Sequence, residues 1–273
     1  MSVYLVGNNS FIQTNFYNLY VNKLDLIKIT FCELIRTKPI LDGDIVVNFS
    51  FDNFLFKNKY IVNKDRDLKL IKFLKNKQIL FIILSTRMVY KPKLNIKETC
   101  LKRPINIYGR NKLIIENQCS QIKNIKPKIL ILRLSNIIGY EINRIRSSLM
   151  SQIINGIKKK NILLDNLWDK KKDLMPVELF SKVLFNLIKK RASGIFNVGS
   201  GVSISLHELS KILLRRKKFK NIKITIKKKL VNNSDDSYSY NISKLKNVYK
   251  FNYEKKNLIN DLKKISKKIY ENK

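Results

Sequence analysis

The first half of this chain alternates short apolar runs with amphipathic stretches, and this alternation constrains the fold more than any other feature. Apolar runs typical of strands lie at residues 3–6, 26–31, 45–49, 79–84 and 128–134. Stretches with helical spacing lie between them, at residues 11–20, 60–74 and 106–120. Continuous apolar strands that alternate with helices indicate a parallel sheet covered on both faces. The pattern therefore predicts an α/β fold with a doubly wound parallel sheet over residues 1–140.

The second half of the chain has a mixed pattern. Residues 147–158, 177–190 and 205–214 have helical spacing, as does the tail from residue 258 onward. Short strands are predicted at residues 194–198 and 222–226. These elements predict a smaller mixed α/β substrate lobe over residues 141–273, partly interleaved with the sheet domain.

Composition excludes several classes of protein. With 273 residues and 44% hydrophobic content, the chain can bury a sizeable core. No run of about 18 uncharged apolar residues occurs, so we expect no membrane span. No secretory signal is visible at the N-terminus, and Cys32, Cys100 and Cys119 lack metal-ligand spacing, which predicts a cytoplasmic protein with reduced thiols. With His207 as the single histidine, we expect no metal site.

The net charge of +36 has two interpretations. One is a nucleic-acid or anionic-membrane surface. The other is biased coding, because Lys, Asn, Ile, Phe and Tyr are abundant while alanine occurs once, at Ala192. The lysines are spread over the whole length rather than gathered in one arm, which favours the second interpretation. We therefore expect no specific nucleic-acid partner.

The sequence around Tyr108 and Lys112 suggests acid–base chemistry. Positions i and i+4 share one face of a helix, so the Lys112 ammonium is expected near the Tyr108 phenol. A nearby positive charge lowers the pKa of a phenol. Thr86, at the end of an apolar run, can share a substrate oxygen with that phenol. These groups can move a proton on or off a carbinol while hydride moves elsewhere.

Seven segments in order resemble one family. They are residues 6–12, 44–50, 60–63, 85–90, 132–139, 172–177 and 194–201. Together they resemble the extended short-chain dehydrogenases/reductases, and more narrowly the NAD-dependent epimerases/dehydratases that act on nucleotide sugars. The similarity extends over nearly the whole chain. It implies a Rossmann-type fold, NAD or NADP as cofactor and a nucleotide sugar as substrate, while a homodimer stays open.

The resemblance also assigns roles to individual residues. The catalytic residues it implies are Thr86, Tyr108 and Lys112. The implied cofactor-binding residues are Gly7, Ser10, Phe11, Ile12 and Asn63, together with Tyr108 and Lys112. Thr86, Asn136 and Lys172 are the implied substrate-binding residues.

The chain departs from the family pattern in ways that matter. Of the three glycines of the first turn only Gly7 is present, and Ser10 and Gln13 hold the other two positions. Glycines there let the backbone approach a pyrophosphate, so we expect Gln13 to point away or to push the helix outward. Arg87 and Met88 stand where the dehydratases of the family carry two acids, which argues against a 4,6-dehydratase.

The sequence thus predicts an NAD(P)-dependent oxidoreductase or epimerase of the 4-ketoreductase or 4-epimerase type. Its setting would be the synthesis of surface polysaccharide precursors. The alternative is a non-catalytic protein that binds a dinucleotide or a sugar nucleotide, or acts as a scaffold, with a degenerate glycine turn. Glu33 and Arg36 favour NAD and NADP respectively, so the choice between the two cofactors stays open.

Overall fold

The larger part of the molecule is built on a six-stranded parallel sheet. The computed structural model describes residues 1–37, 39–140, 153, 155–157, 159–165, 169–215, 221–227 and 236–271. The strands are β1 (Val3–Val6), β2 (Leu26–Ile29), β3 (Ile45–Asn48), β4 (Leu80–Thr86), β5 (Lys128–Leu134) and β9 (Gly194–Val198). They are ordered β2-β1-β3-β4-β5-β9, and every neighbouring pair is parallel. The predicted Rossmann-type sheet is confirmed.

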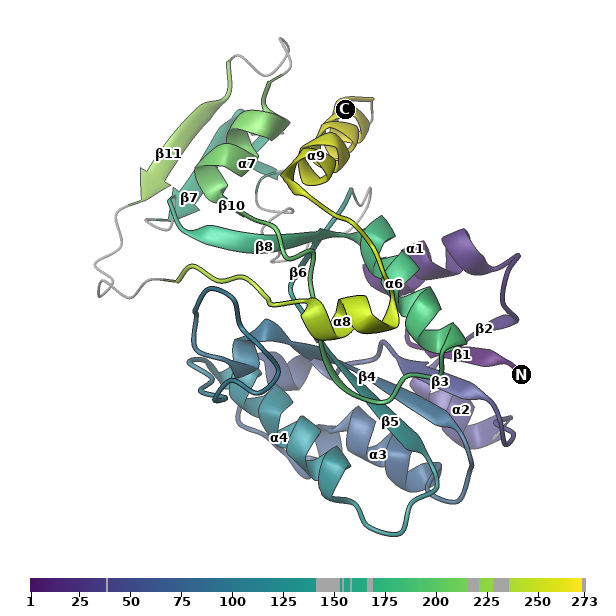
Figure 1. The fold of residues 1–273 in the computed structure, drawn as a ribbon. Helices are drawn as coiled ribbons and strands as arrows, with labels where there is room; N and C mark the ends of the chain where they lie inside the picture. Colours follow the sequence, from purple (N-terminus) through teal and green to yellow (C-terminus); the bar gives the residue numbers. More distant parts are fainter. Residues whose placement is uncertain are drawn as a thin grey trace.

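Helices cover both faces of this sheet (Figure 1). The helices are α1 (Phe11–Tyr20) and α6 (Val177–Lys189) on one face, and α2 (Phe31–Thr37), α3 (Arg66–Phe73) and α4 (Ile107–Gln121) on the other. In β1, Val3 and Leu5 pack toward the first face and Tyr4 and Val6 toward the second. Each central strand therefore needs apolar side chains in both directions, which explains its continuous apolar run.

The order of the strands reverses beside β1. The chain goes from β1 outward to β2, and then returns to place β3 on the opposite side of β1. In open α/β sheets, ligands bind outside the carboxyl ends of the strands at such a reversal. The start of α1 lies at this point and carries residues of the predicted site, and the end of β3 lies beside it.

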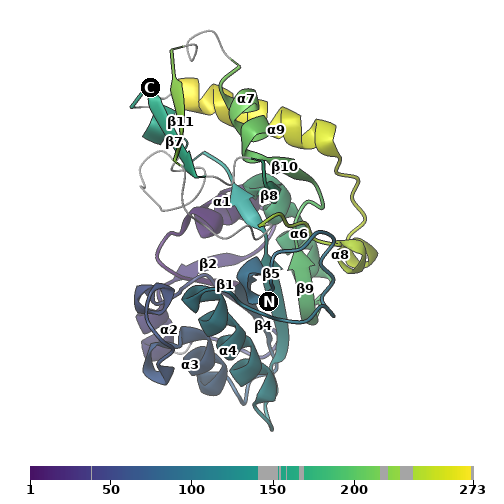
Figure 2. The ribbon, with the colours of Figure 1, turned by 90° about the vertical axis from the view of Figure 1, so that its left-hand side faces the viewer.

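The second half of the chain contributes both to the large sheet and to a separate layer. A three-stranded sheet joins β10 (Ser203–Ser205), β8 (Lys171–Pro176) and β6 (Asn136–Ile138), and β7 (Asn161–Asp165) pairs with β11 (Lys223–Lys227). Helices α7 (Leu206–Leu213) and α9 (Lys255–Glu271) pack on this layer over their own apolar core (Figure 2). Helix α8 (Ser243–Val248) instead contributes Leu245 to the core of the large sheet. The boundary at residue 140 stays a prediction.

Two local predictions differ from the structure. The helix predicted at residues 60–74 is a short 3-10 turn, η2 (Val62–Lys64), followed by α3. Asp65 separates them, because its carboxylate accepts the N–H of Leu68 at 2.9 Å and caps α3. Helix α2 was missed because Phe31 was placed in the preceding strand; Thr30 and Glu33 exchange hydrogen bonds there as a capping box.

Most of the helix predicted at residues 147–158 lies outside the described residues. The described residues within this range, 153 and 155–157, are helical.

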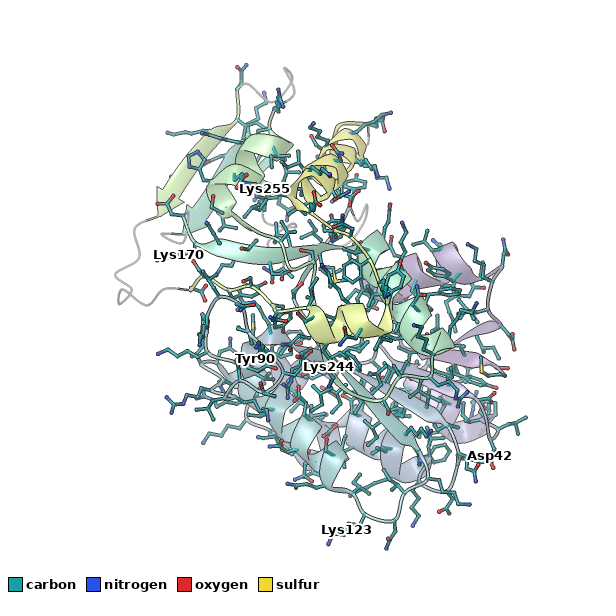
Figure 3. All side chains as sticks on the ribbon, in the orientation of Figure 1. Asp42, Tyr90, Lys123, Lys170, Lys244 and Lys255 are labelled. Atoms are coloured by element: carbon teal, nitrogen blue, oxygen red, sulfur yellow. The ribbon has the colours of Figure 1, made fainter. Side chains whose placement is uncertain are left out.

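Across the described part of the chain, no helix combines the length and the apolar character needed to cross a membrane. The labelled lysines Lys123, Lys170, Lys244 and Lys255 lie in separate regions of the molecule (Figure 3). The absence of a specific nucleic-acid partner stays a prediction.

Candidate active site

The start of α4 packs directly on the end of β4. Strand β4 ends at Thr86, and the 3-10 turn η3 (Arg87–Val89) follows at once. A Cβ on Gly109 would lie 2.2 Å from the carbonyl oxygen of Met88, so only glycine permits this approach. Asn106 caps α4 by accepting the N–H of Gly109 at 2.7 Å. The turn of helix that carries Tyr108 therefore lies against the segment that follows Thr86.

Lys112 is buried one turn further along α4, with three groups around its ammonium. Its Nζ donates to the carbonyl oxygen of Leu84 at 2.8 Å and lies 3.6 Å from Oδ2 of Asp67. The face of the Phe51 ring lies on the third side, with its centroid 4.3 Å from Nζ. An ammonium has three N–H donors, so these three groups can occupy all of its hydrogen-bonding directions.

Asp67 is a member of the site that the sequence analysis missed. It is buried on α3 and accepts a hydrogen bond from Nδ2 of Asn48, at the end of β3, at 2.6 Å. Burial raises the pKa of this carboxyl group to about 6, although Lys112 and the bond from Asn48 lower it. The available signal was a carboxylate beside Leu68, Leu70 and Ile71, in a helix whose other buried residues are apolar.

Tyr108 lies in an aromatic cluster with Phe51 and Phe56. Its ring stacks on Phe56 at a centroid distance of 4.6 Å and meets the edge of Phe51 at 5.5 Å. Burial raises the pKa of the phenol above its usual value; Lys112 lowers it by less, and Asp67 raises it further. Lys112 lowers this pKa, as expected, but desolvation outweighs that charge and Asp67 opposes it, so the pKa lies above its ordinary value. The phenol is therefore protonated at neutral pH.

A second buried ion pair fixes α4 against the sheet below the site. Glu116 accepts bonds from the guanidinium of Arg133 on β5, the shortest of them 2.6 Å from Nη2 to Oε2. The hydroxyl of Ser85 donates to Glu116, and Arg133 donates to the hydroxyl of Tyr90. Tyr90 in turn donates to Oδ1 of Asn197 on β9 at 3.0 Å. This network explains the buried polar residues around Thr86 without a ligand.

The first turn has a different structure from the one expected. Ser10 caps α1 by accepting the N–H of Gln13 at 3.2 Å. The Gln13 side chain accepts the N–H of Ser10 at 3.2 Å and donates Nε2–H to the carbonyl oxygen of Leu5 at 2.8 Å. Gln13 thus neither points away nor lies outside the core: its amide fills the space beside Gly7, where an added Cβ would lie 3.0 Å from Oε1. The amide completes a capping box that a glycine could not form.

The other predicted cofactor-binding residues differ in position: Phe11 and Ile12 lie at a helix start, whereas Asn63 lies exposed on a 3-10 turn. Phe11 and Ile12 open α1, where backbone N–H groups favour an anion. The ring of Phe11 packs against Gly139, at which a Cβ would lie 2.5 Å from Cζ. Asn63 is exposed in η2, before α3 begins. Its role as a cofactor ligand stays a prediction, and the buried polar groups that this segment supplies are Asp65 and Asp67.

Two of the three predicted substrate-binding residues, Asn136 and Lys172, meet at Tyr238. The hydroxyl of Tyr238 accepts the backbone N–H of Asn136 at 3.2 Å and donates to the carbonyl oxygen of Asp173 at 3.0 Å. Lys172 lies 5.7 Å from the centroid of the ring, and its ammonium is ion-paired with Asp236. The structure thus brings Asn136 on β6 and Lys172 on β8 to one buried tyrosine.

Asp173 joins two of the motifs that the sequence analysis singled out. Its carboxylate accepts the N–H groups of Ser200 at 3.0 Å, and of Gly201 and Tyr240 at 3.2 Å. A Cβ on Gly199 would lie 2.9 Å from Oδ2 of Asp173, so the loop needs glycine to approach. The segment after β9 is thereby fixed to β8, which carries Lys172.

Comparison with solved structures identifies the fold. The UDP-glucuronic acid 4-epimerase from Bacillus cereus, in complex with NAD, superimposes with a TM-score of 0.81 at 15% identity, over 99% of this chain and 97% of that one. The UDP-N-acetylglucosamine 4-epimerase from Methanobrevibacter ruminantium M1, in complex with UDP-N-acetylmuramic acid, gives 0.80 at 17%, over 100% and 99%. The chain has the fold of nucleotide-sugar epimerases and dehydratases. The resemblance inferred from the motifs is confirmed in the structure.

A third structure shows that the similarity extends to a protein bound to the phosphorylated cofactor. RMD from Pseudomonas aeruginosa, complexed with NADPH, gives a TM-score of 0.76 at 16% identity, over 98% of this chain and 99% of that one. No family profile matches the sequence, and no curated protein matches it. The likeness to this fold therefore rests on the structure and on the ordered motifs.

Within this epimerase-like fold, the residues present fit a dinucleotide at two places. The start of α1, after Gly7, offers helix N–H groups beside the end of β3. Tyr108 and Lys112 lie at the carboxyl end of β4, on the same edge of the sheet. The Phe51 ring lies over the Lys112 ammonium, with its centroid 4.3 Å from Nζ, and would have to move for a ligand to reach that side.

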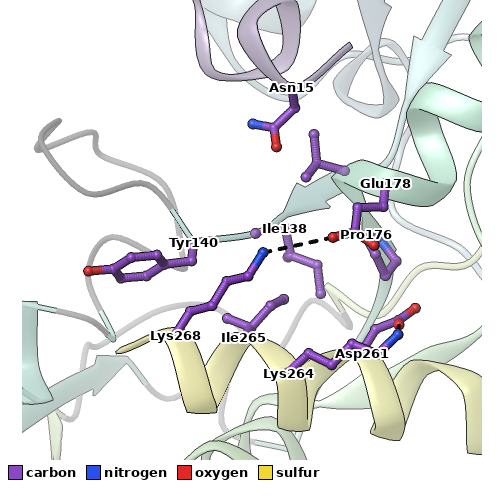
Figure 4. Close-up of a pocket in the computed structure, with 11 residues that line it drawn as sticks. Asn15, Ile138, Tyr140, Pro176, Glu178, Asp261, Lys264, Ile265 and Lys268 are labelled. Carbon is purple, nitrogen blue, oxygen red and sulfur yellow. Dashed lines mark hydrogen bonds and ion pairs between the residues drawn. The ribbon is translucent and has the colours of Figure 1, made fainter. Parts of the chain in front are cut away.

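A separate pocket of the epimerase-like fold contains none of the predicted site residues. It is lined by α1, the end of β6, the start of α6 and α9, and Lys268 pairs with Glu178 across it at 3.9 Å (Figure 4). The lining also includes Asn15, Tyr140 and Asp261. This pocket lies where the lobe meets the sheet domain, and we assign no role in the chemistry to it.

Proposed function

We propose that this chain is an NAD(P)-dependent enzyme that acts on a nucleotide-activated sugar, as a 4-ketoreductase or a 4-epimerase. One observation carries the proposal: the start of α4, which carries Tyr108, packs on the segment that follows Thr86, and buried Lys112 donates to the carbonyl oxygen of Leu84 in β4. The similar solved structures include 4-epimerases of nucleotide sugars and complexes with NAD and NADPH. The choice between the two cofactors stays open.

Tyr108 is the proton-transfer group of the proposed mechanism. Because its pKa is raised, the phenol holds its proton at neutral pH and can donate it to a ketone oxygen. The hydroxyl of Thr86 donates a second hydrogen bond to the same oxygen as negative charge develops there. A nicotinamide, when bound, supplies the hydride.

Other residues of the chain would hold the substrates. The start of α1, with the Ser10 cap, would bind the pyrophosphate of the dinucleotide. Lys112 would bind its ribose once Phe51 turns aside. Asn136 and Lys172, which meet at Tyr238, would contact the diphosphate of the sugar nucleotide.

A non-catalytic binding protein is the second candidate, and one observation favours it. The ammonium of Lys112 is already surrounded by Leu84, Asp67 and Phe51. A chain that had lost its cofactor could keep such a closed cluster as part of its core. The two candidates differ in whether Lys112 becomes available to a ligand.

The deciding experiment measures cofactor binding first and turnover second. Purified protein is titrated with NADH and NADPH while nicotinamide fluorescence is followed, and calorimetry gives the affinity for NAD. The protein is then incubated with NAD(P)H and 4-keto sugar nucleotides, and with UDP-glucose and UDP-N-acetylglucosamine for epimerisation. Cofactor binding with reduction or epimerisation is the expected result. If neither NAD(H) nor NADPH binds, the enzymatic proposal is wrong, and the non-catalytic binding protein is the remaining candidate.

A further inference from the structure

The two residues that would contact the diphosphate are both engaged by one segment of the chain, residues 236–238. The ammonium of Lys172 is ion-paired with the carboxylate of Asp236. Two positions later, the hydroxyl of Tyr238 accepts the backbone N–H of Asn136 at 3.2 Å. The segment therefore occupies the donors that a diphosphate would use, and Asp236 supplies the negative charge.

The two partners of this ion pair differ in exposure. The side chain of Lys172 is 6% exposed and that of Asp236 is 22% exposed, so the carboxylate is the partner nearer to solvent. A buried ammonium without a counter-charge is strongly unfavourable, and Lys172 therefore needs an anion with or without a ligand. A carboxylate and a phosphate both present charged oxygens to an ammonium, so one can replace the other.

The backbone of the segment is held in place independently of that carboxylate. The N–H of Tyr238 donates to the carbonyl oxygen of Lys171 at 2.9 Å, and the N–H of Asp173 donates to the carbonyl oxygen of Tyr238 at 3.1 Å. The ammonium of Lys172 also donates to the backbone carbonyl oxygen of Asp236 at 2.6 Å. The carboxylate can consequently leave Lys172 by rotation of its own side chain, while the segment stays on β8.

Asp173, next to Lys172, provides the contrast. Its carboxylate is fully buried and accepts three backbone N–H groups, two from the loop after β9 and one from Tyr240. Among the described residues, the carboxylate of Asp236 has Lys172 as its only hydrogen-bond partner. One carboxylate thus fixes the fold, and the other makes a single contact that a ligand can replace.

We propose that Asp236 occupies the place of a phosphate on Lys172, and that the sugar nucleotide binds by displacing this carboxylate. The chain thereby carries a built-in competitor for its own substrate, which lowers the affinity for the diphosphate. This inference rests on the proposed function, and it adds the regulation of the diphosphate site. Neutralising Asp236 should strengthen the binding of a nucleoside diphosphate and leave the binding of the nucleoside unchanged.

The test separates the phosphates from the nucleoside. Calorimetry compares UDP with uridine and GDP with guanosine, with NAD present so that the cofactor site does not take up the nucleotide. Asp236→Asn and Asp236→Ser remove the charge. Asp261→Asn is the matched control, because Asp261 is 24% exposed, is ion-paired with Lys264 at 3.1 Å and changes the net charge equally. Lys172→Gln, alone and with Asp236→Asn, completes a double-mutant cycle.

For the nucleotide that the wild type binds, both Asp236 variants should raise the affinity for the diphosphate about tenfold, the scale of a close charge pair. The affinity for the nucleoside should not change, and Asp261→Asn should leave both affinities as in the wild type. In the Lys172→Gln background, Asp236→Asn should have no effect, because the carboxylate acts through that ammonium.

Three results overturn the inference while the proposed function stands. They are unchanged or weaker diphosphate binding in the Asp236 variants, an equal gain in Asp261→Asn, and a gain that persists without Lys172. Loss of the folded structure in both Asp236 variants, as seen by circular dichroism, also overturns it, because the carboxylate then serves the fold. If no nucleotide binds to any of the proteins, the proposed function and this inference fall together.

Discussion

Helix α4 carries one member of each of two buried ion pairs, and the pairs differ in how completely they are satisfied. Glu116 meets the guanidinium of Arg133 through several hydrogen bonds, and Ser85 adds another. Four positions earlier, Lys112 has one carbonyl bond and a looser contact of 3.6 Å with Asp67. A saturated pair fixes the structure, whereas a loose pair can exchange a partner for a ligand. The first pair thus positions the helix, and the second is the one that we propose to meet a ligand.

The largest effect is expected from breaking the saturated pair. Glu116→Gln leaves the buried guanidinium of Arg133 without its counter-charge, and the free energy of unfolding should fall by about 3–5 kcal/mol. Chemical denaturation followed by circular dichroism measures this change. The double replacement Glu116→Leu with Arg133→Met should recover a large part of the loss, because it removes both charges. Lys267→Gln, in an exposed pair, is the control and should change little. Equal stability of Glu116→Gln and the control would show that the pair is not structural.

The next effect concerns turnover rather than stability. Tyr108→Phe should reduce turnover by about 100-fold or more, the usual scale for loss of a proton-transfer group, while it leaves the fold intact. Lys112→Met should reduce turnover by a similar factor and also weaken cofactor binding. The rates are measured with the substrate found in the screen described above, and circular dichroism checks the fold. Near-normal rates in both variants would show that Tyr108 and Lys112 take no part in turnover. The pair of Lys112 and Asp67 would then serve the structure alone, as the pair of Arg133 and Glu116 does.

Asp67 should give the loose pair a dependence on pH. Its pKa in the folded protein is raised to about 6, above the ordinary value of 3.8, so the folded state binds the proton more tightly than the unfolded state does. Stability from this group is complete below about pH 4 and is lost as the pH rises toward 6. The loss should be on the order of 1–3 kcal/mol. Denaturation midpoints of the wild type and of Asp67→Asn, compared from pH 4 to 7, isolate this contribution. Parallel curves for the two proteins would contradict the assignment.

The smallest effect is expected at the aromatic cover of Lys112. Phe51→Ala removes the ring that shields the ammonium, and a cation–π contact of this kind is worth about 1 kcal/mol. Affinity for NAD(H) should therefore rise about threefold to fivefold, as measured by calorimetry. Phe56→Ala is the matched control, since it removes a ring that stacks on Tyr108, whereas the ring over Lys112 is that of Phe51. Weaker binding in Phe51→Ala than in Phe56→Ala would show that the ring supports the cofactor instead of excluding it.

Much of the sheet domain follows from the sequence. The bounds of β1, α1, β5 and β9 coincide with the predicted ranges, because a strand buried on both faces has a continuous apolar run with clear ends. The expectation that Tyr108 and Lys112 lie near the end of β4 rested on helical spacing and on the family resemblance, and the structure packs the start of α4 on that end. Asp67 was not expected there, because nothing near it in sequence shows that α3 brings it to Lys112 across the chain.

By itself the sequence determined the doubly wound sheet, the family that it resembles, and the helix face that carries Tyr108 and Lys112. Only the tertiary structure decided the state of these groups. Phe51, Phe56 and Asp67 reach Tyr108 and Lys112 from other segments of the chain, and together they raise the pKa that Lys112 alone would lower. Tyr238 comes from still further along the chain to meet Arg87. The pKa of Tyr108 and the contact of Arg87 with Tyr238 depend on desolvation and on distances in space, which spacing along the chain does not encode.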